Sequence, residues 1–146
     1  MKTLLATLAL TILAVSVAFA QSVSSSAKVG KAAKGVVPVT VTIQIPSGYH
    51  IYGPKAGSAG IATAIKVKGT DFKLGAIKYP KTKTIEIGGE KFEVYEQKVS
   101  VPVTISRAKK MAGKQKVHLL ITTQACNDRT CLPPSTVDLP VTVNFG

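Results

Sequence analysis

The sequence predicts an all-β protein, an antiparallel immunoglobulin-like β-sandwich of about seven to nine strands. Three observations predict this class. Four long segments alternate between apolar and other residues with a period of two. Shorter strand candidates lie between them, separated by turn signals. No segment shows convincing helical periodicity.

The first long segment, VVPVTVTIQIP, begins at Val36 and carries an apolar residue at every odd position from 37 to 45. The other three are EVYEQKVSVPVTIS, KQKVHLLITTQ and TVDLPVTVNF. Such alternation is typical of strands with one buried face. Pro38, Pro102 and Pro140 fall on the outward set. Because proline cannot donate to a ladder, we expect a sheet edge or a bulge at each.

Four shorter strand candidates lie between the long ones, at about residues 50–52, 64–68, 73–79 and 82–87. Glycine-containing pairs such as Gly88-Gly89 separate them, as expected for turns. Together with the long segments they place one β-sandwich domain over residues 36–146.

The N-terminal residues predict export. Residues 1–20 combine Lys2, an apolar run and the small-residue signal Ala18-Phe19-Ala20, a pattern typical of a cleaved secretory signal peptide. An uncleaved membrane anchor is the alternative, because the run is close to bilayer length. We expect a mature N-terminus near Gln21, a periplasmic or secreted protein and no membrane span after cleavage. Residues 21–35, rich in Ser, Ala and Lys, predict a flexible arm.

The chain is basic, with a formal net charge of +12 at pH 7. Such a charge favours attraction to anionic envelope surfaces or to an acidic partner. The export signal and the scattered lysines argue against nucleic acid, so we interpret the charge mainly as a solvated surface. Four of the seven acids cluster in a short stretch. They are Glu86, Glu90, Glu93 and Glu96.

The only two cysteines, Cys126 and Cys131, lie in the stretch QACNDRTCLPP. A disulfide between them would close a short loop and stabilise the fold by roughly 2 kcal/mol in the chain-entropy model, so it would be a weak staple. Strict alternation places Cys126 on the outward set, and the intervening residues favour a turn at the mouth of a hairpin. This setting favours a labile, exposed, redox-active pair. Arg129 would lower a thiol pKa and Asp128 would raise it.

Other chemistries are open or disfavoured. A structural hairpin clip remains an alternative to a redox pair. The two thiols with His50 or His118 could hold copper or zinc, although the spacing does not fit blue copper and a lone histidine is more often a surface strand residue. No G-x-S-x-G motif indicates a hydrolase.

The stretch QACNDRTCLPP, after VHLLITT and VSVPVTIS, resembles the N-terminal periplasmic domain of the thiol:disulfide interchange protein DsbD family over about residues 36–145. The segment GYHIYGPKAGSAG resembles related domains, including those of copper-sensitivity suppressor proteins. The resemblance implies an immunoglobulin-like domain without a cofactor that relays reducing equivalents. Its partners would be thioredoxin-like periplasmic proteins of the disulfide isomerase or membrane reductase type. Cys126 and Cys131 would be the redox pair, with Cys131 forming the mixed disulfide and Cys126 resolving it.

Two departures from the family refine these expectations. Relatives shield the cysteines with a cap loop that bears acidic and aromatic residues. Here Glu86 would keep the acidic role, and Tyr52 or Phe92 would supply the aromatic one. Relatives also continue into a membrane-embedded and a thioredoxin-like domain, whereas this chain ends at Gly146, so we expect a separate reductant.

The competing hypothesis is a non-catalytic cell-envelope binding module that binds through its basic surface.

Overall fold

The computed structural model describes residues 22–57 and 60–146, and in these ranges the regular elements are strands. The predicted signal peptide, residues 1–20, lies outside them. Within the described part of the chain, no helix is long and apolar enough to cross a membrane. The strands are β1 (Ser24–Val29), β2 (Val36–Gln44), β3 (His50–Tyr52), β4 (Ala64–Val67), β5 (Phe72–Leu74), β6 (Lys83–Ile87), β7 (Glu90–Glu96), β8 (Lys98–Arg107), β9 (Lys114–Thr123), β10 (Ala125–Cys126) and β11 (Ser135–Asn144).

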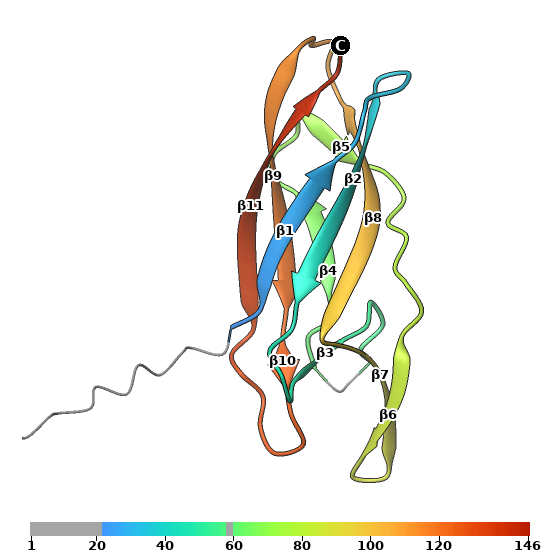
Figure 1. Cartoon of the computed structure of the whole chain (residues 1–146), viewed down its shortest axis with the longest axis vertical. Helices are drawn as coiled ribbons and strands as arrows, with labels where there is room; N and C mark the ends of the chain where they lie inside the picture. Colours follow the sequence, from blue (N-terminus) through green and yellow to red (C-terminus); the bar gives the residue numbers. More distant parts are fainter. Residues whose placement is uncertain (1–21, 58–59) are drawn as a thin grey trace, which may run out of the picture.

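The strands form three antiparallel sheets, ordered β1-β2-β8-β5, β11-β9-β4 and β10-β3-β7-β6. Figure 1 shows an elongated molecule in which the first two sheets form its body and the third lies at the lower end. The predicted immunoglobulin-like sandwich is confirmed. The described residues form eleven strands rather than about seven to nine, because β1 and the two-residue β10 add to the eight predicted segments and one of those segments divides into β7 and β8.

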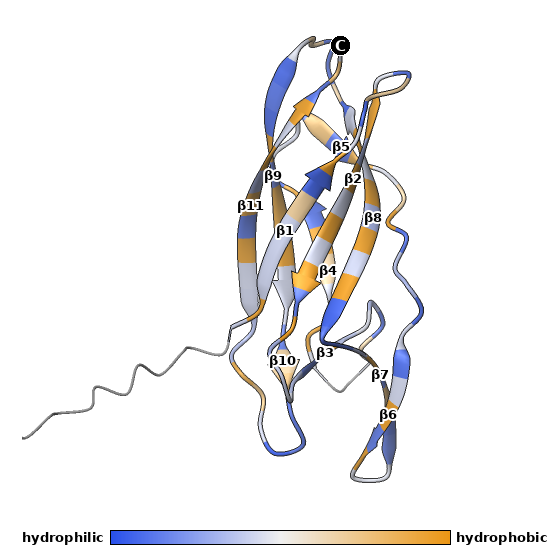
Figure 2. Cartoon of the chain, in the orientation of Figure 1, coloured by the Kyte–Doolittle hydropathy of each residue, from blue (hydrophilic) through white to orange (hydrophobic). Residues whose placement is uncertain are grey.

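The core lies between the sheets β1-β2-β8-β5 and β11-β9-β4, and its residues follow the predicted alternation. Along β2 and β8 the apolar and polar residues alternate visibly in Figure 2. The odd-numbered residues from Val37 to Ile43 and from Val99 to Ile105 are at most 4 % exposed. Val117, Leu119 and Ile121 of β9 close the core from the facing sheet.

Strand β1 corrects the prediction of a flexible arm over residues 21–35. Ser24–Val29 pairs with β2 in continuous antiparallel register, from Ser24 opposite Gln44 to Val29 opposite Val39. Its partly buried residues alternate, and Ala27 and Val29 pack against the core. The side chains of β1 are too small and polar for the sequence to indicate a strand, and the strand forms because β2 supplies hydrogen-bond partners for its backbone.

Two predictions about strand continuity have different outcomes. Pro38 lies just beyond the end of the β1–β2 ladder, and Pro102 lies beyond the end of the β5–β8 ladder. Their carbonyls accept hydrogen bonds from the N–H groups of Gly30 and Lys78, which lie outside the strands. The segment EVYEQKVSVPVTIS, however, is not one strand. It breaks at Gln97, whose φ is 61°, and the chain passes there from the third sheet into the first.

Candidate functional site

The sheet β10-β3-β7-β6 has two differently packed faces. Ile51, Tyr95 and Ala125 join the main core. Tyr52, Val94 and Cys126 form a second, smaller buried cluster. Because neighbouring residues of a strand point to opposite faces, Cys126 looks away from the main core, as the alternation predicted.

Cys126 and Cys131 form a disulfide with a Cα–Cα distance of 4.0 Å. Its two halves differ, because Cys126 is 1 % exposed while Cys131 lies on the surface. The side chain of Asn127 accepts hydrogen bonds from the N–H groups of Arg129 and Thr130, both at 2.9 Å, and so fixes the predicted turn. The disulfide therefore sits at a hairpin mouth as expected, but the prediction that Cys126 is exposed is wrong.

The burial of Cys126 follows from a change of partner strand. After Thr123 the chain leaves the β9 ladder, and β10 pairs with β3, placing Cys126 directly opposite His50 and Ala125 opposite Ile51. The outward face of β9 thus continues into the face of β10 that carries Cys126, and side chains of the neighbouring strands cover that face.

Aromatic rings provide that cover. The rings of His50 and Tyr52 meet edge to face with centroids 5.6 Å apart, and those of Tyr52 and Phe92 do so at 6.1 Å. Tyr52 shares the small cluster with Cys126, and Phe92 packs against it together with Ile85. The structure thus brings together Cys126 and both predicted aromatic residues.

Residues 60–63 of the loop between β3 and β4 pack over Tyr52. A Cβ atom on Gly60 would lie 2.5 Å from Cε2 of Tyr52, so the backbone of this loop touches the ring. The hydroxyl of Thr63 donates to the carbonyl of Tyr52 at 2.6 Å. These contacts hold the loop against the aromatic cover of Cys126.

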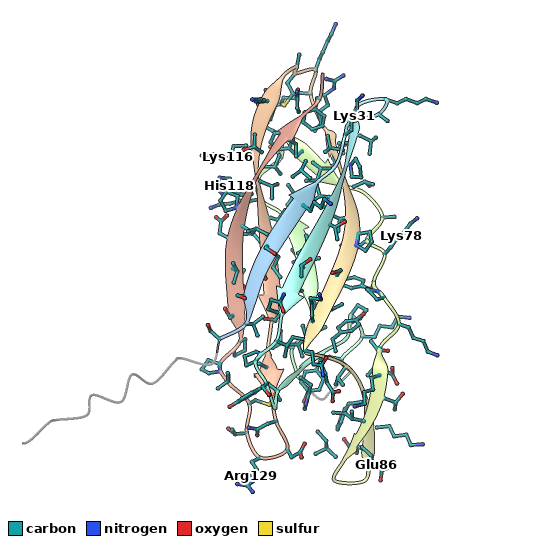
Figure 3. All side chains as sticks on the ribbon, in the orientation of Figure 1. Lys31, Lys78, Glu86, Lys116, His118 and Arg129 are labelled. Carbon is teal, nitrogen blue, oxygen red and sulfur yellow. A yellow bond between two sulfur atoms is a disulfide. The ribbon has the colours of Figure 1, made fainter. Side chains whose placement is uncertain are left out.

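An open groove of about 400 Å³ lies beside the disulfide turn, and three acids line it. Glu86 comes from β6, Glu96 from β7 and Asp128 from the disulfide turn. Figure 3 shows Glu86 and Arg129 at the same end of the molecule, with Arg129 at the tip of the turn. Arg129 does not line the groove.

Glu93 and Glu96 also make contacts at the protein surface. Glu93 accepts hydrogen bonds from the hydroxyls of Thr82 and Thr84, which hold the pKa of that carboxyl below its usual range. Glu96 pairs with Lys83 at 2.8 Å on the other face of β7.

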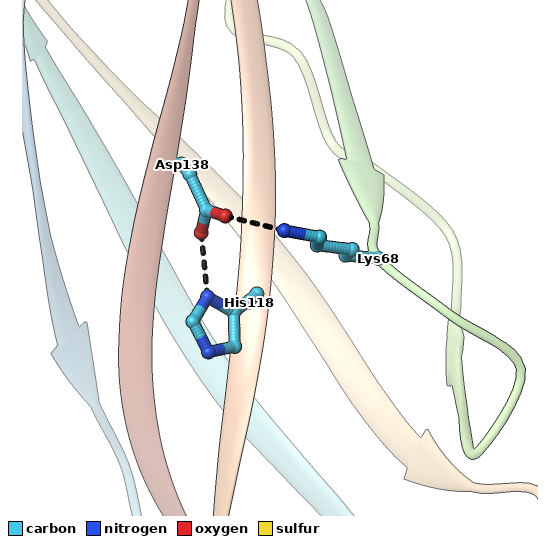
Figure 4. Close-up of polar contacts among 3 residues, drawn as sticks. All are labelled: Lys68, His118 and Asp138. Carbon is cyan, nitrogen blue, oxygen red and sulfur yellow. Dashed lines mark hydrogen bonds and ion pairs between the residues drawn. The ribbon is translucent and has the colours of Figure 1, made fainter.

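The two histidines differ from each other. His118 is a surface strand residue, as expected, and its Nδ1 lies 2.6 Å from Asp138, as Figure 4 shows. His50 is 4 % exposed, which the sequence interpretation missed. Burial lowers the pKa of His50 below its usual value of 6.5, and the charges of Asp128 and Glu96 oppose that shift. The signal for its burial was its place between Tyr49 and Ile51-Tyr52, an almost continuous apolar run.

Among the residues that the structure describes, no group of three or more His, Cys, Asp and Glu side chains gathers as metal ligands would. The geometry offers one buried and one exposed cysteine, joined by a disulfide across a tight turn at the end of an immunoglobulin-like sandwich. These are the features of a thiol–disulfide exchange domain.

The comparisons with known proteins agree. The chain belongs to the family described as thiol:disulfide interchange protein DsbD, N-terminal, which its sequence matches over residues 15–142. A comparison with curated protein sequences gave no match.

Solved structures of this kind share the fold. The N-terminal periplasmic domain of ScsB from Proteus mirabilis matches with a TM-score of 0.64 and 16 % identity, over 84 % of this chain and 46 % of that one. The reduced DsbD N-terminal domain of Neisseria meningitidis matches with a TM-score of 0.50 and 22 % identity, over 76 % of this chain and 87 % of that one. The complex of the DsbD and PilB N-terminal domains from the same organism matches with a TM-score of 0.52 and 21 % identity, over 83 % of this chain and 84 % of that one. This chain thus spans less than half of the ScsB domain.

Proposed function

We propose that this chain is a periplasmic or secreted thiol–disulfide exchange domain. It passes reducing equivalents to or from thioredoxin-fold partners through Cys126 and Cys131. The observation that carries the proposal is the asymmetry of the disulfide, with Cys131 on the surface and Cys126 buried behind it. Family membership and the solved complex of a DsbD N-terminal domain with another protein domain support a protein partner. The A-x-A signal supports the location.

The different exposure of the two cysteines supports different roles for them. In the reducing direction the Cys131 thiolate attacks one sulfur of a partner disulfide, and the other partner sulfur leaves as a thiolate. Cys126 then attacks Cys131 Sγ, the bond to the partner breaks, and the Cys126–Cys131 disulfide closes. Two electrons pass to the partner. In the opposite direction a partner thiolate attacks Cys131, and Cys126 is the leaving group.

The surrounding residues tune this exchange in our proposal. Tyr52 and Phe92 shield Cys126 from small oxidants and thiols, because they cover its face of the sheet. Arg129, exposed at the tip of the turn, favours the thiolate form of Cys131. Glu86 and Asp128 line the groove and give it the negative charge that a partner would meet.

The test is the equilibrium reduction potential of the disulfide in the purified mature protein, titrated against glutathione or dithiothreitol. A value of roughly −270 to −180 mV, the range of thioredoxin-like proteins, supports the proposal. A value below about −300 mV would make the bond a structural clip. Cys126→Ala should trap partners as mixed disulfides on Cys131, whereas the matched control Cys131→Ala should not.

The second candidate is a non-catalytic envelope binding module, which the net charge of +12 favours. It predicts a low reduction potential together with salt-sensitive binding to anionic envelope material that is equal in the oxidised and reduced protein. Copper or zinc capture predicts tight metal uptake that begins only after reduction of the disulfide.

A further inference from the structure

His50 is a buried polar residue beside the disulfide. It lies directly opposite Cys126 in the β3–β10 pair. Side chains of such a pair project from the same face, with Cβ atoms about 4.5–5.5 Å apart. Nε2 of His50 is fully buried and has no hydrogen-bond partner among the described residues. A buried nitrogen without a hydrogen-bond partner lowers the stability of the fold, so its position beside a redox-active cysteine calls for a functional explanation.

The surroundings of His50 are acidic and aromatic. Asp128 of the disulfide turn, Glu96 of β7 and Glu86 of β6 line the groove with it. The ring of Tyr52 packs against it from its own strand. Burial keeps the pKa of His50 below 6.5, so the ring is neutral near pH 7 and has a free lone pair, while the nearby carboxylates favour the imidazolium once a proton arrives.

The buried position of Cys126 creates a need for such a group. Cys126 must lose a proton to attack the mixed disulfide, and burial in an apolar cluster raises the pKa of a thiol. Water reaches Cys126 poorly, since the side chain is 1 % exposed.

We propose that His50 is the proton-transfer residue of the disulfide pair. It takes the proton from the Cys126 thiol as Cys126 attacks Cys131 Sγ, and the imidazolium gives that proton to the departing partner thiolate or to solvent. In the reverse direction neutral His50 takes the proton that the partner thiol loses as it attacks Cys131, and gives it to the Cys126 sulfur as the S–S bond breaks. This inference rests on the proposed exchange function and adds a residue to the same site.

The test uses a small disulfide in place of a protein partner. Reduced protein is mixed with equimolar 5,5′-dithiobis(2-nitrobenzoate), and the release of thionitrobenzoate is followed from pH 5 to 9. The first equivalent reports the attack by Cys131, and the second reports the resolution by Cys126. His50→Gln should slow the second phase roughly 100-fold near pH 7, the lower end of what a positioned acid–base group contributes, and leave the first phase unchanged. His118→Gln, at the surface histidine, is the matched control and should change neither phase.

Equal second phases in His50→Gln and the native protein, in rate and in pH profile, would overturn the inference. Should the variant not fold, the native protein alone decides. The inflection of its second phase must coincide with the titration of His50 followed by NMR, and a mismatch also overturns the inference. A reduction potential outside the thioredoxin range would overturn the proposed function but leave this result standing, because the small disulfide needs no partner.

Discussion

The side chain of Gln124 accepts a hydrogen bond from the backbone N–H of Ile61 at 3.1 Å. Its amide nitrogen donates to the carbonyl of Leu132 at 3.3 Å. One side chain therefore ties the loop over Tyr52 to the segment that follows Cys131. The loop and the disulfide turn are mechanically connected through this residue.

Gln124→Ala removes both hydrogen bonds. Since each is worth about 1 kcal/mol, we expect the free energy of unfolding to fall by roughly 1–2 kcal/mol. We also expect the disulfide to be reduced faster by a small phosphine, because the loop over Tyr52 loses its anchor. Urea unfolding and the reduction rate check this. Gln115→Ala, which removes a bond to Ala112 at the other end of the molecule, is the control and should not change the reduction rate.

Phe92→Ala opens the aromatic cover of Cys126. In a Cys131→Ser background we expect iodoacetamide to alkylate Cys126 faster, with a stability loss of up to about 3 kcal/mol. Phe72→Ala is the matched control, since Phe72 stacks on Phe145 with centroids 6.1 Å apart, away from the disulfide cluster. Equal acceleration by both variants would show that general loosening, not local cover, controls access.

Reduction of the disulfide should leave the protein folded. The pair closes a short loop, with a sequence separation of 5, so its loss costs about 2 kcal/mol in the chain-entropy model. Urea unfolding of the oxidised protein, the reduced protein and Cys126→Ala/Cys131→Ala checks this. Unfolding on reduction would mean that the bond is a structural element of the fold.

Asp138 gives a prediction about acid stability. Hydrogen bonds from His118 and then Lys68 hold the pKa of this carboxyl below its ordinary value of 3.8. The folded state therefore favours the ionised form, and this contribution is present above pH 3.8 and lost as the pH falls through the folded-state pKa. NMR titration should place the Asp138 midpoint below 3.8, and Lys68→Ala should raise it. A midpoint at or above 3.8 in the native protein would contradict the contacts of Figure 4.

Removal of residues 21–31 tests the role of β1. Val23 and Val29 pack partly against the core, and each contributes up to about 1.5 kcal/mol by burial, so we expect a loss of roughly 3 kcal/mol. The deletion also exposes the edge of β2, which should increase aggregation. Urea unfolding and light scattering measure both effects. Native-like stability of the truncated protein would show that β1 is dispensable.

Much of the fold could be predicted because one rule governs the long strands. Period-two alternation located β2, β8, β9 and β11, since most of their inward residues are valine, isoleucine or leucine. The same rule missed β1, because its inward positions are filled by Ser25 and Ala27 as well as Val29, and this pattern gains meaning only when β2 lies beside it.

The site was harder to predict, because it depends on one strand changing its partner. Alternation placed Cys126 outward correctly, but nothing local indicates that β10 pairs with β3 and that Tyr52 and Phe92 then cover it. The burial of His50 follows from the same pairing. Cross-sheet contacts of this kind arise between segments far apart in sequence, so no local pattern encodes them.

The small sheet separates the disulfide cluster on one face from the main core on the other. We therefore expect that opening or closing the S–S bond alters only one face of β10 and the adjoining turn and leaves the sandwich behind it unchanged. Under the proposed function, a partner that distinguishes the reduced from the oxidised domain therefore has very little to recognise. Its selectivity would come from the turn around Asn127–Thr130, which is the one segment whose ends the covalent change releases.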